Sequence, residues 1–262
     1  MNEFKNDDSL KAYLKKESKR LNISIGNIYN TFFSRDLLYR LSKIDHSNDI
    51  IVKGSFAQFV HLRKFVRPIT DIDLTSTIAH HDPLILLVNA MCKKECDDDI
   101  DYILRGKPRR TNSGIIKFPI GAKYGKINHP IGIDYRESHP CIYEKVTKVV
   151  PKVFSKDEEY EIVVASMEET LAEKLYIIAV AKNAKEGVLN TRAKDFYDVY
   201  QLHGGDYDLD KFSYYFERMI RDYGGITDIN TLSTAYLNQD FIDKHKIMLR
   251  FFRNVTFLLL SR

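Results

Sequence analysis

The chain has 262 residues, of which 44% are hydrophobic and 29% are charged, and its net charge is +4. Such a composition excludes a disordered chain, and no apolar run is long enough to cross a bilayer. Three cysteines without a paired C-x-x-C pattern argue against a disulfide framework and against a structural zinc site. The N-terminal residues lack the apolar stretch of a signal peptide, so we expect a cytoplasmic protein without a membrane partner.

The first predicted elements are helices. Apolar residues recur at helical spacing across residues 9–44, with Lys and Arg between them. Residues 50–53 then have the pattern of a short strand, and "DIDLTSTI" at 71–78 alternates as a half-buried strand does. A helix is predicted over residues 81–96, because an Asp-Pro pair suited to the helix N-terminus precedes an apolar run.

The middle of the chain alternates strands and turns. Three strands are predicted in "DYILRG", "SGIIKFPIGAKYG" and "HPIGIDYRE", and an edge strand is predicted near "EIVVA". From Ser166 the pattern is helical, and Ser166 with Glu169 forms a capping-box sequence. We therefore predict an α+β fold with a small mixed sheet: N-terminal helices over 1–48, a core over 49–165 and a helical C-terminal domain over 166–262.

Charge is distributed unevenly along the chain. Residues 95–101 carry five acids in seven positions, whereas residues 105–126 carry seven Lys or Arg and no acid. A basic stretch of this kind can meet phosphates. The alternative is the solvated face of a hairpin.

Asp71 and Asp73 are the main candidates for a metal site. Residues two apart on a strand point to the same face, so the two carboxylates stand side by side with Ile72 on the other face. Neighbouring carboxylates repel each other unless a cation lies between them, and Mg²⁺ prefers one or two carboxylates with water and phosphate oxygens. The alternative is an exposed edge strand with solvated aspartates.

Gly54 and Ser55, upstream of this pair, fit phosphate binding. Gly54 allows close approach of the backbone to a phosphate, and Ser55 adds a hydroxyl donor. A helix that begins near Ser55 would direct its N-terminal amides at a triphosphate. Each motif alone is common, but the two motifs in a strand–helix–strand context favour nucleotide chemistry.

This arrangement resembles the DNA polymerase β-like nucleotidyltransferase superfamily, whose signature is a Gly-Ser, a spacer and Asp-x-Asp on a strand. The resemblance implies that residues 49–165 form a nucleotidyltransferase core that uses an NTP and one or two Mg²⁺ ions. A third carboxylate on a nearby strand usually completes the metal site, and Asp134 in "HPIGIDY" is the candidate. The alternative for Asp134 is a turn residue before Tyr135 and Arg136.

The segments "VKG", "RPITDIDL" and "LAEKL…RAKDFYDVY" are similar to the AbiEii/AbiGii-type nucleotidyltransferase toxins of bacterial toxin–antitoxin and phage abortive-infection modules. The similarity runs from about residue 10 to about residue 202 and implies active-site roles for Lys174 and Asp195. Two features depart from the family. Many relatives have Gly-Gly-Thr at Gly54-Ser55-Phe56, and many place Ser or Thr two positions before the first Asp, where this chain has Thr70 directly before it.

The residues themselves leave alternatives for Lys174 and Asp195. Lys174 borders an apolar stripe, where its ammonium would neutralise phosphate charge, or it snorkels with its head in water. Asp195 would hold Lys174 or accept a proton from the attacking hydroxyl, or it belongs with Asp198 to the acidic flank of an amphipathic helix. Arg67 and Arg192 are further candidates for phosphate contact, with surface ion pairing as the alternative.

The predicted reaction is Mg²⁺-dependent transfer of a nucleoside monophosphate from an NTP to an acceptor hydroxyl, in a cleft between the core and the C-terminal domain. The predicted residues are Asp71, Asp73 and Asp134 for the metal, Gly54, Ser55, Arg67 and Lys174 for the NTP, and Lys174, Asp195 and the three metal carboxylates for catalysis. The resemblance and the basic stretch favour RNA, above all the 3′ end of tRNA, as the acceptor, and the resemblance implies an antitoxin. The alternatives are a small-molecule (antibiotic-type) or protein-modifying nucleotidyltransferase, and a binding module without activity.

Overall fold

The computed structural model describes residues 4–76, 82–93, 99–137, 144–183 and 193–223. The chain divides into two compact units, Met1–Ala165 and Ser166–Arg262. The second unit thus begins at the residue where the sequence pattern becomes helical. The further division of the first unit into N-terminal helices and a core stays a prediction.

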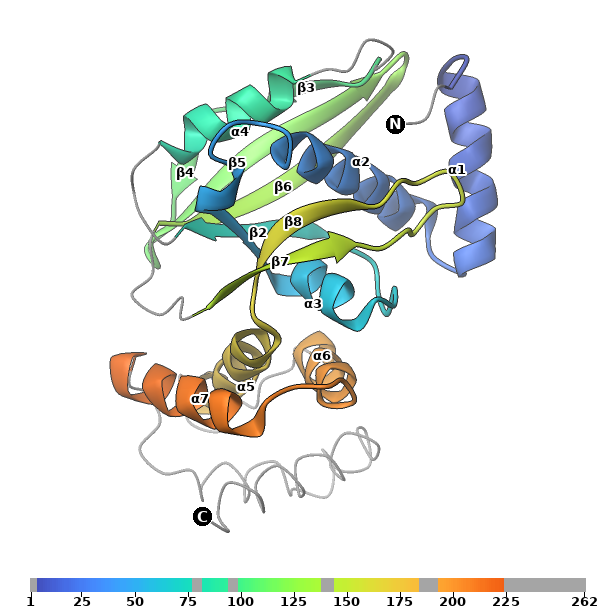
Figure 1. Ribbon diagram of the computed structural model, residues 1–262. Helices are drawn as coiled ribbons and strands as arrows, with labels where there is room; N and C mark the ends of the chain where they lie inside the picture. The colour runs from blue at the N-terminus through green and yellow to red at the C-terminus, as the bar shows by residue number, and fades with distance from the viewer. Residues whose placement is uncertain (1–3, 77–81, 94–98, 138–143, 184–192, 224–262) are drawn as a thin grey trace. The chain divides into compact units, whose positions relative to one another are not determined.

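The first unit combines helices with one mixed sheet (Figure 1). Its helices are α1 (Asp7–Leu21), α2 (Ile25–Leu41), the 3-10 turn η1 (Ser47–Asp49), α3 (Gly54–Leu62) and α4 (Pro83–Cys92). Its strands are β1 (Ile50–Lys53), β2 (Asp71–Ser76), β3 (Asp101–Leu104), β4 (Arg109–Arg110), β5 (Ile115–Tyr124), β6 (Ile127–Arg136), β7 (Lys145–Val150) and β8 (Tyr160–Ala165). Asp82 caps α4 by accepting a hydrogen bond from the Leu84 amide, as the Asp-Pro pair predicted.

The strands are ordered β3-β5-β6-β2-β1-β8-β7, and β4 pairs with β5. β1 and β2 are antiparallel, whereas β2 and β6, and β1 and β8, are parallel. This order confirms the predicted α+β class and mixed sheet. One expectation is wrong: the "EIVVA" strand, β8, is not at the edge but lies between β1 and β7. Its nearly continuous burial fits an internal strand, because both of its faces are covered.

One face of the sheet carries the core, and the other carries the polar residues predicted to do the chemistry. α2 packs against β6 and β2 and also contacts α4 (Figure 1). Ile72 and Ile133 point to this covered face and are buried. Asp71, Asp73 and Asp134 alternate with them along β2 and β6, so their side chains project from the opposite face.

α1 is joined to the connection between β7 and β8. The Arg20 guanidinium donates a hydrogen bond to the Val153 carbonyl at 2.6 Å, and the Tyr13 hydroxyl lies 3.3 Å from the Ser155 hydroxyl. The Lys156 ammonium stands over the Tyr13 ring, 5.7 Å from its centroid. These contacts hold two basic segments that are far apart in the sequence, α1 and the β7–β8 connection, next to each other.

The second unit is helical in its described part, which comprises α5 (Met167–Asn183), α6 (Ala193–His203) and α7 (Leu209–Tyr223). The Ser166 hydroxyl accepts a hydrogen bond from the Glu169 amide, so Ser166 caps α5 as predicted. Helix α5 packs against both α6 and α7. Within the described residues, no helix combines the length and apolar character that a membrane span requires.

Candidate active site

The junction between β1 and α3 brings Gly54 against Asp73. Gly54 adopts φ +63, in the left-handed region, and starts α3 directly after Lys53. A Cβ atom at this position would overlap with Oδ2 of Asp73. Glycine is therefore required here for two reasons, the backbone conformation and the space taken by the carboxylate.

Ser55 occupies the first turn of α3. Its side chain is buried, and its hydroxyl has no hydrogen-bond partner among the described residues. A buried hydroxyl without a partner carries a free-energy cost that a bound ligand can remove. The position near the helix N-terminus, where backbone amides are unpaired, suits an anion.

A row of charged residues crosses the face of the sheet opposite to α2. Strand register pairs Arg109 with Lys117, Lys117 with Asp134, Asp134 with Asp73, and Asp73 with Lys53. Paired residues on neighbouring strands point to the same side. We call these five residues the charged row: it has two cations on β4 and β5, two carboxylates on β6 and β2, and a cation on β1.

The register excludes two of the alternatives considered for the carboxylates. β2 lies between β6 and β1, so Asp71 and Asp73 are not on an edge strand. Asp134 lies inside β6 rather than in a turn. Asp71 pairs with Gly132, where an added Cβ would meet nothing within 4 Å, so the sheet surface beside Asp71 is open. The Thr70 hydroxyl donates a hydrogen bond to Oδ1 of Asp71 at 3.0 Å.

Lys117 is the charged neighbour that the sequence pattern did not single out. Its Nζ donates to Oδ2 and Oδ1 of Asp134 at 2.8 and 3.2 Å. This hydrogen bond raises the pKa of Lys117 above its usual value, and the charges of Asp134, Asp71 and Asp73 raise it further. Its ammonium is therefore protonated and lies in the field of all three carboxylates.

The donor set of this face suits a hard cation, because three carboxylates on adjacent strands offer the oxygen ligands that Mg²⁺ prefers. Within the described part of the chain, no three His, Cys, Asp or Glu side chains converge as ligands in this conformation. Asp134 instead directs its oxygens at Lys117. A metal bound by Asp71, Asp73 and Asp134 would thus compete with Lys117 for the oxygens of Asp134.

The second unit holds a buried lysine between two carboxylates. Nζ of Lys174 on α5 lies 3.4 Å from Oδ1 of Asp195 and 3.0 Å from Oδ2 of Asp198, both on α6. The Lys174 side chain is 12% exposed and both aspartates are 0% exposed. Snorkelling is therefore the wrong interpretation of Lys174, and a solvated flank is the wrong interpretation of Asp195 and Asp198.

The other predicted residues are Arg67, Arg192 and the basic stretch over residues 105–126. Arg67 is half-buried, and its Nη1 is 3.4 Å from the carbonyl of Pro68. Arg192 lies outside the described residues. In the basic stretch over residues 105–126, the alkyl part of Arg105 lies over Gly121, and Arg110 forms a 2.7 Å ion pair with Glu137.

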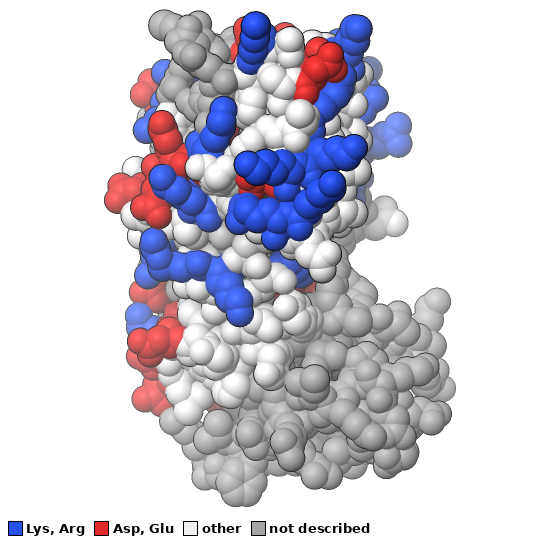
Figure 2. All heavy atoms as spheres, turned by 90° about the vertical axis from the view of Figure 1, so that its right-hand side faces the viewer, with Lys and Arg blue, Asp and Glu red and all other residues white. Residues whose placement is uncertain are grey.

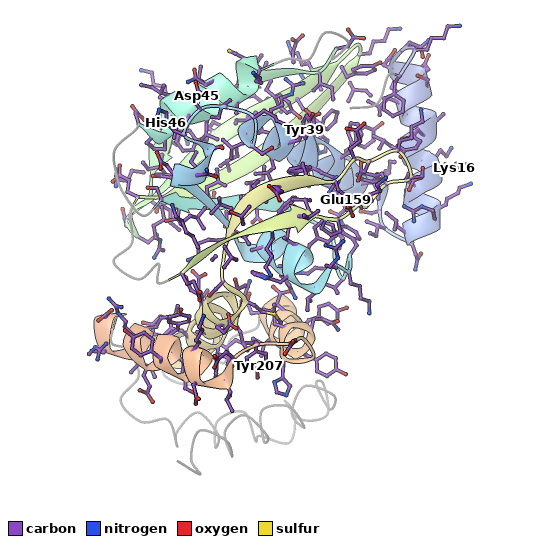
Figure 3. The ribbon with its side chains drawn as sticks, in the orientation of Figure 1. Lys16, Tyr39, Asp45, His46, Glu159 and Tyr207 are labelled. Carbon is purple, nitrogen blue, oxygen red and sulfur yellow. The ribbon has the colours of Figure 1, made fainter. Side chains whose placement is uncertain are left out.

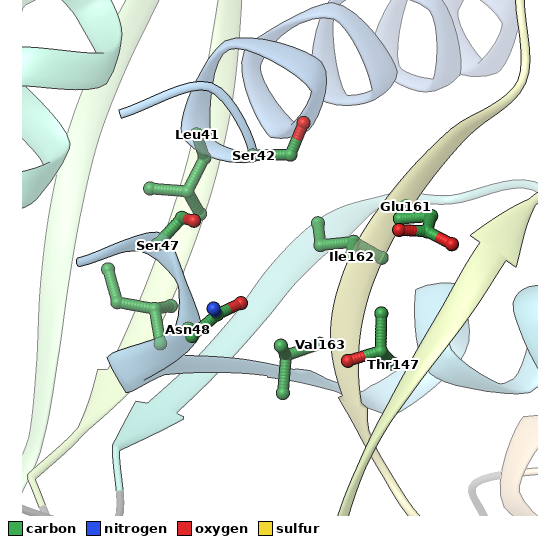
Figure 4. Close-up of a pocket in the computed structure, with 9 residues that line it drawn as sticks. Leu41, Ser42, Ser47, Asn48, Thr147, Glu161, Ile162 and Val163 are labelled. Atoms are coloured by element: carbon green, nitrogen blue, oxygen red, sulfur yellow. The ribbon is translucent and has the colours of Figure 1, made fainter. Parts of the chain in front are cut away.

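A separate pocket of about 220 Å³ lies in the first unit (Figure 4). Its lining comes from the end of α2, η1, β1, β7 and β8, and comprises Leu41, Ser42, Ser47, Asn48, Ile50, Thr147, Glu161, Ile162 and Val163. None of these residues belongs to the predicted site, and Glu161 is the one charged group among them. The pocket therefore offers no second arrangement of catalytic groups.

Comparison with known proteins gives one clear match. Residues 36–257 match the family described as "Nucleotidyl transferase AbiEii toxin, Type IV TA system", which covers far more than half of the chain. A search of the curated proteins found no match.

Several solved structures are similar to this chain at low sequence identity. JHP933 from Helicobacter pylori has 15% identity and a TM-score of 0.47, with 82% of this chain and 80% of that chain covered. An antigenic nucleotidyltransferase-like protein from Paracoccidioides brasiliensis has 14% identity and a TM-score of 0.38, with 76% and 92% covered. The family assignment rests on the sequence match and not on these two similarities.

Proposed function

The chain belongs to the AbiEii nucleotidyltransferase toxin family of type IV toxin–antitoxin systems, and from this premise we propose that it transfers a nucleoside monophosphate from an NTP to RNA in a Mg²⁺-dependent reaction. The observation that carries the proposal is the charged row, in which Asp73 is the register partner of Asp134 and packs against Gly54. A membership in this family also implies an antitoxin partner. A role in defence against phage is part of the proposal.

The proposed metal ligands are Asp71, Asp73 and Asp134. When bound there, Mg²⁺ would polarise the phosphate oxygens and offset the charge that develops as pyrophosphate leaves. Ser55 and the first amides of α3 would receive the triphosphate, because a buried hydroxyl and a helix N-terminus both favour an anion. Asp134 would also accept the proton of the attacking hydroxyl once that hydroxyl lies within hydrogen-bond reach.

We propose catalytic roles for Lys174 and Asp195, and a role in NTP binding for Lys174. Asp195 and Asp198 both contact the Lys174 ammonium, so ion pairing holds its position before any ligand binds. Arg67 is proposed as a further phosphate contact. A fixed cation stabilises a transferring phosphoryl group without reorganisation at the moment of reaction.

The direct test is incubation of the protein with labelled NTPs, Mg²⁺ and total RNA. The wild type should label RNA, and Asp73→Ala should lower labelling by at least about 10²-fold, as loss of a preorganised charged group at a transition state does. Asp45→Ala, which removes an exposed carboxylate in the turn after α2, is the matched control and should keep most of the activity. Equal labelling by wild type and Asp73→Ala would contradict the proposed mechanism.

RNA is proposed as the acceptor, with the 3′ end of tRNA favoured, because the first unit presents basic surfaces. Figure 2 shows Lys and Arg side chains gathered on the face that contains α1. The exposed cations of α1 and of the β7–β8 connection are Lys15, Lys16, Lys19, Arg20, Lys152 and Lys156. Lys16 points away from the sheet (Figure 3). On the sheet itself, Arg109 extends the charged row beyond Lys117.

Two neighbouring arginines allow a matched test of the acceptor. Arg109 is exposed on the face of the charged row, whereas its neighbour Arg110 is already paired with Glu137. Arg109→Ala should weaken RNA binding and reduce the dependence of the binding constant on salt by roughly one unit in the log–log slope, and Arg110→Ala should change both less. An acceptor that is a small molecule would be nearly indifferent to Arg109→Ala. Label on a protein band instead of RNA would identify a protein acceptor.

A further inference from the structure

We propose that Lys117 is an exchangeable counter-ion of the carboxylate cluster: it holds Asp134 while no divalent cation is bound, yields Asp134 when a cation enters, and thereby sets the affinity for that cation. The inference rests on the metal role proposed for Asp71, Asp73 and Asp134. Lys117 is a positioning residue in this scheme, because it acts on Asp134 and not on the reacting atoms.

The first observation is the geometry of the pair. The Lys117 ammonium is within hydrogen-bond distance of both oxygens of Asp134, at 2.8 and 3.2 Å. Lys117 and Asp134 are also direct register partners on β5 and β6, so the contact follows from the strand pairing itself. A lone pair that accepts a hydrogen bond from the ammonium is not available to a cation, so Lys117 and a cation beside Asp73 compete for the oxygens of Asp134.

The second observation is the exposure of the pair. The side chains of Lys117 and Asp134 are 56% and 24% exposed. A pair open to water is weak, because water and salt screen the attraction, and both groups are resolvated when the pair opens. Lys117 can therefore leave Asp134 at small cost, as an exchange with a divalent cation requires.

The third observation is the reach of the charge. Lys117 stands in the fields of Asp71 and Asp73 as well as in that of Asp134. The positive charge of Lys117 offsets part of the mutual repulsion of the three carboxylates. A bound divalent cation would offset the same repulsion more strongly. The Lys117 ammonium and the metal ion compete for the negative charge of the carboxylates. Removal of the lysine should therefore raise the affinity of the carboxylates for the metal ion.

β5 offers a matched control for this residue. Lys123 is exposed like Lys117, lies six residues along the same strand and so points to the same face. Its register partners are Asn128 on β6 and Asp101 on β3, and neither is a proposed metal ligand. Both lysines contribute equally to net charge, and of the two only Lys117 is paired in register with a proposed metal ligand.

The experiment measures Mn²⁺, used as a spectroscopic stand-in for Mg²⁺, binding to the full-length protein without nucleotide, by electron paramagnetic resonance. Lys117→Met should bind Mn²⁺ about three- to tenfold more tightly than wild type, and Lys123→Met and Lys117→Arg should bind within about twofold of it. In an Asp134→Asn background, the effect of Lys117→Met on Mn²⁺ affinity should be smaller, because only the weaker interactions with Asp71 and Asp73 remain. Circular dichroism of each variant verifies that it is folded.

The outcomes separate this inference from the proposed function. Equal or weaker Mn²⁺ binding by Lys117→Met, together with loss of binding in Asp73→Asn, would overturn the role of Lys117 and leave the metal site intact. A Lys123→Met effect as large as that of Lys117→Met would also overturn it, because net charge alone would then explain the change. No Mn²⁺ binding by any variant would overturn the inference, whereas the proposed metal dependence would still be decided by the labelling assay, in which NTP phosphates add ligands to the site.

Discussion

The molecule contains two groups in which a lysine meets aspartates, and they differ in their access to water. In the first unit, Lys117 and Asp134 are 56% and 24% exposed. In the second unit, Lys174 is 12% exposed, and its partners Asp195 and Asp198 are completely buried. The distances are similar, between 2.8 and 3.4 Å for the ion pairs concerned.

The difference in solvent access decides what each group can do. An exposed pair is worth little and opens easily, so its members are free to exchange partners with a ligand. The buried group cannot lose its lysine without leaving two carboxylates uncompensated in a medium that solvates charge poorly. The exposed group is thus suited to binding and releasing a cation, and the buried group is suited to holding one ammonium in a fixed position.

The largest expected effect is that of Lys174→Met. This change leaves Asp195 and Asp198 buried without the lysine, and we expect a loss of about 3–5 kcal/mol in the free energy of unfolding, measured by urea denaturation. Adding Asp198→Asn to this variant should restore part of the loss, because one of the two buried charges is removed. A single Lys174→Met variant as stable as wild type would show that the buried group is not a stabilising unit.

The features that could be predicted from the sequence are local ones. The alternation of Asp71, Ile72 and Asp73 fixes which side chains share a face, because the two-residue period is a property of the strand alone. The start of α3 at Gly54 and the cap at Ser166 likewise depend on residues within one turn. These inferences needed no knowledge of what lies across the sheet.

The features that escaped prediction depend on pairing between distant segments. Lys117 lies opposite Asp134 only because β5 and β6 pair in one register, and one residue of slip would turn Lys117 to the other face. The internal position of β8 depends on its parallel pairing with β1, more than a hundred residues earlier. Lys174 is buried because α6 packs against its helix, α5. The sequence of α5 alone was therefore equally compatible with a lysine that snorkels to water.

An intermediate effect is expected for Gly54→Ala, which tests how rigidly the backbone holds the exposed cluster. A Cβ there would require alanine at φ +63 and would displace the Asp73 carboxylate, for a combined loss of about 1–3 kcal/mol and loss of transfer activity. Gly132→Ala is the matched control, since its added methyl would meet nothing within 4 Å. Equal stability and activity of the two variants would mean that Asp73 does not depend on Gly54.

The smallest expected effect on stability is that of Lys117→Met. This variant is the sharpest test of the difference between the exposed Lys117 pair and the buried Lys174 group. Because Lys117 and its partner are exposed, the free energy of unfolding should change by no more than about 0.5 kcal/mol in urea denaturation, against several for Lys174→Met. The small difference from wild type should shrink further at high salt, since screening weakens an exposed pair. A loss above about 2 kcal/mol would show that Lys117 is bound as firmly as Lys174, and an ammonium held that firmly could not give way to a cation.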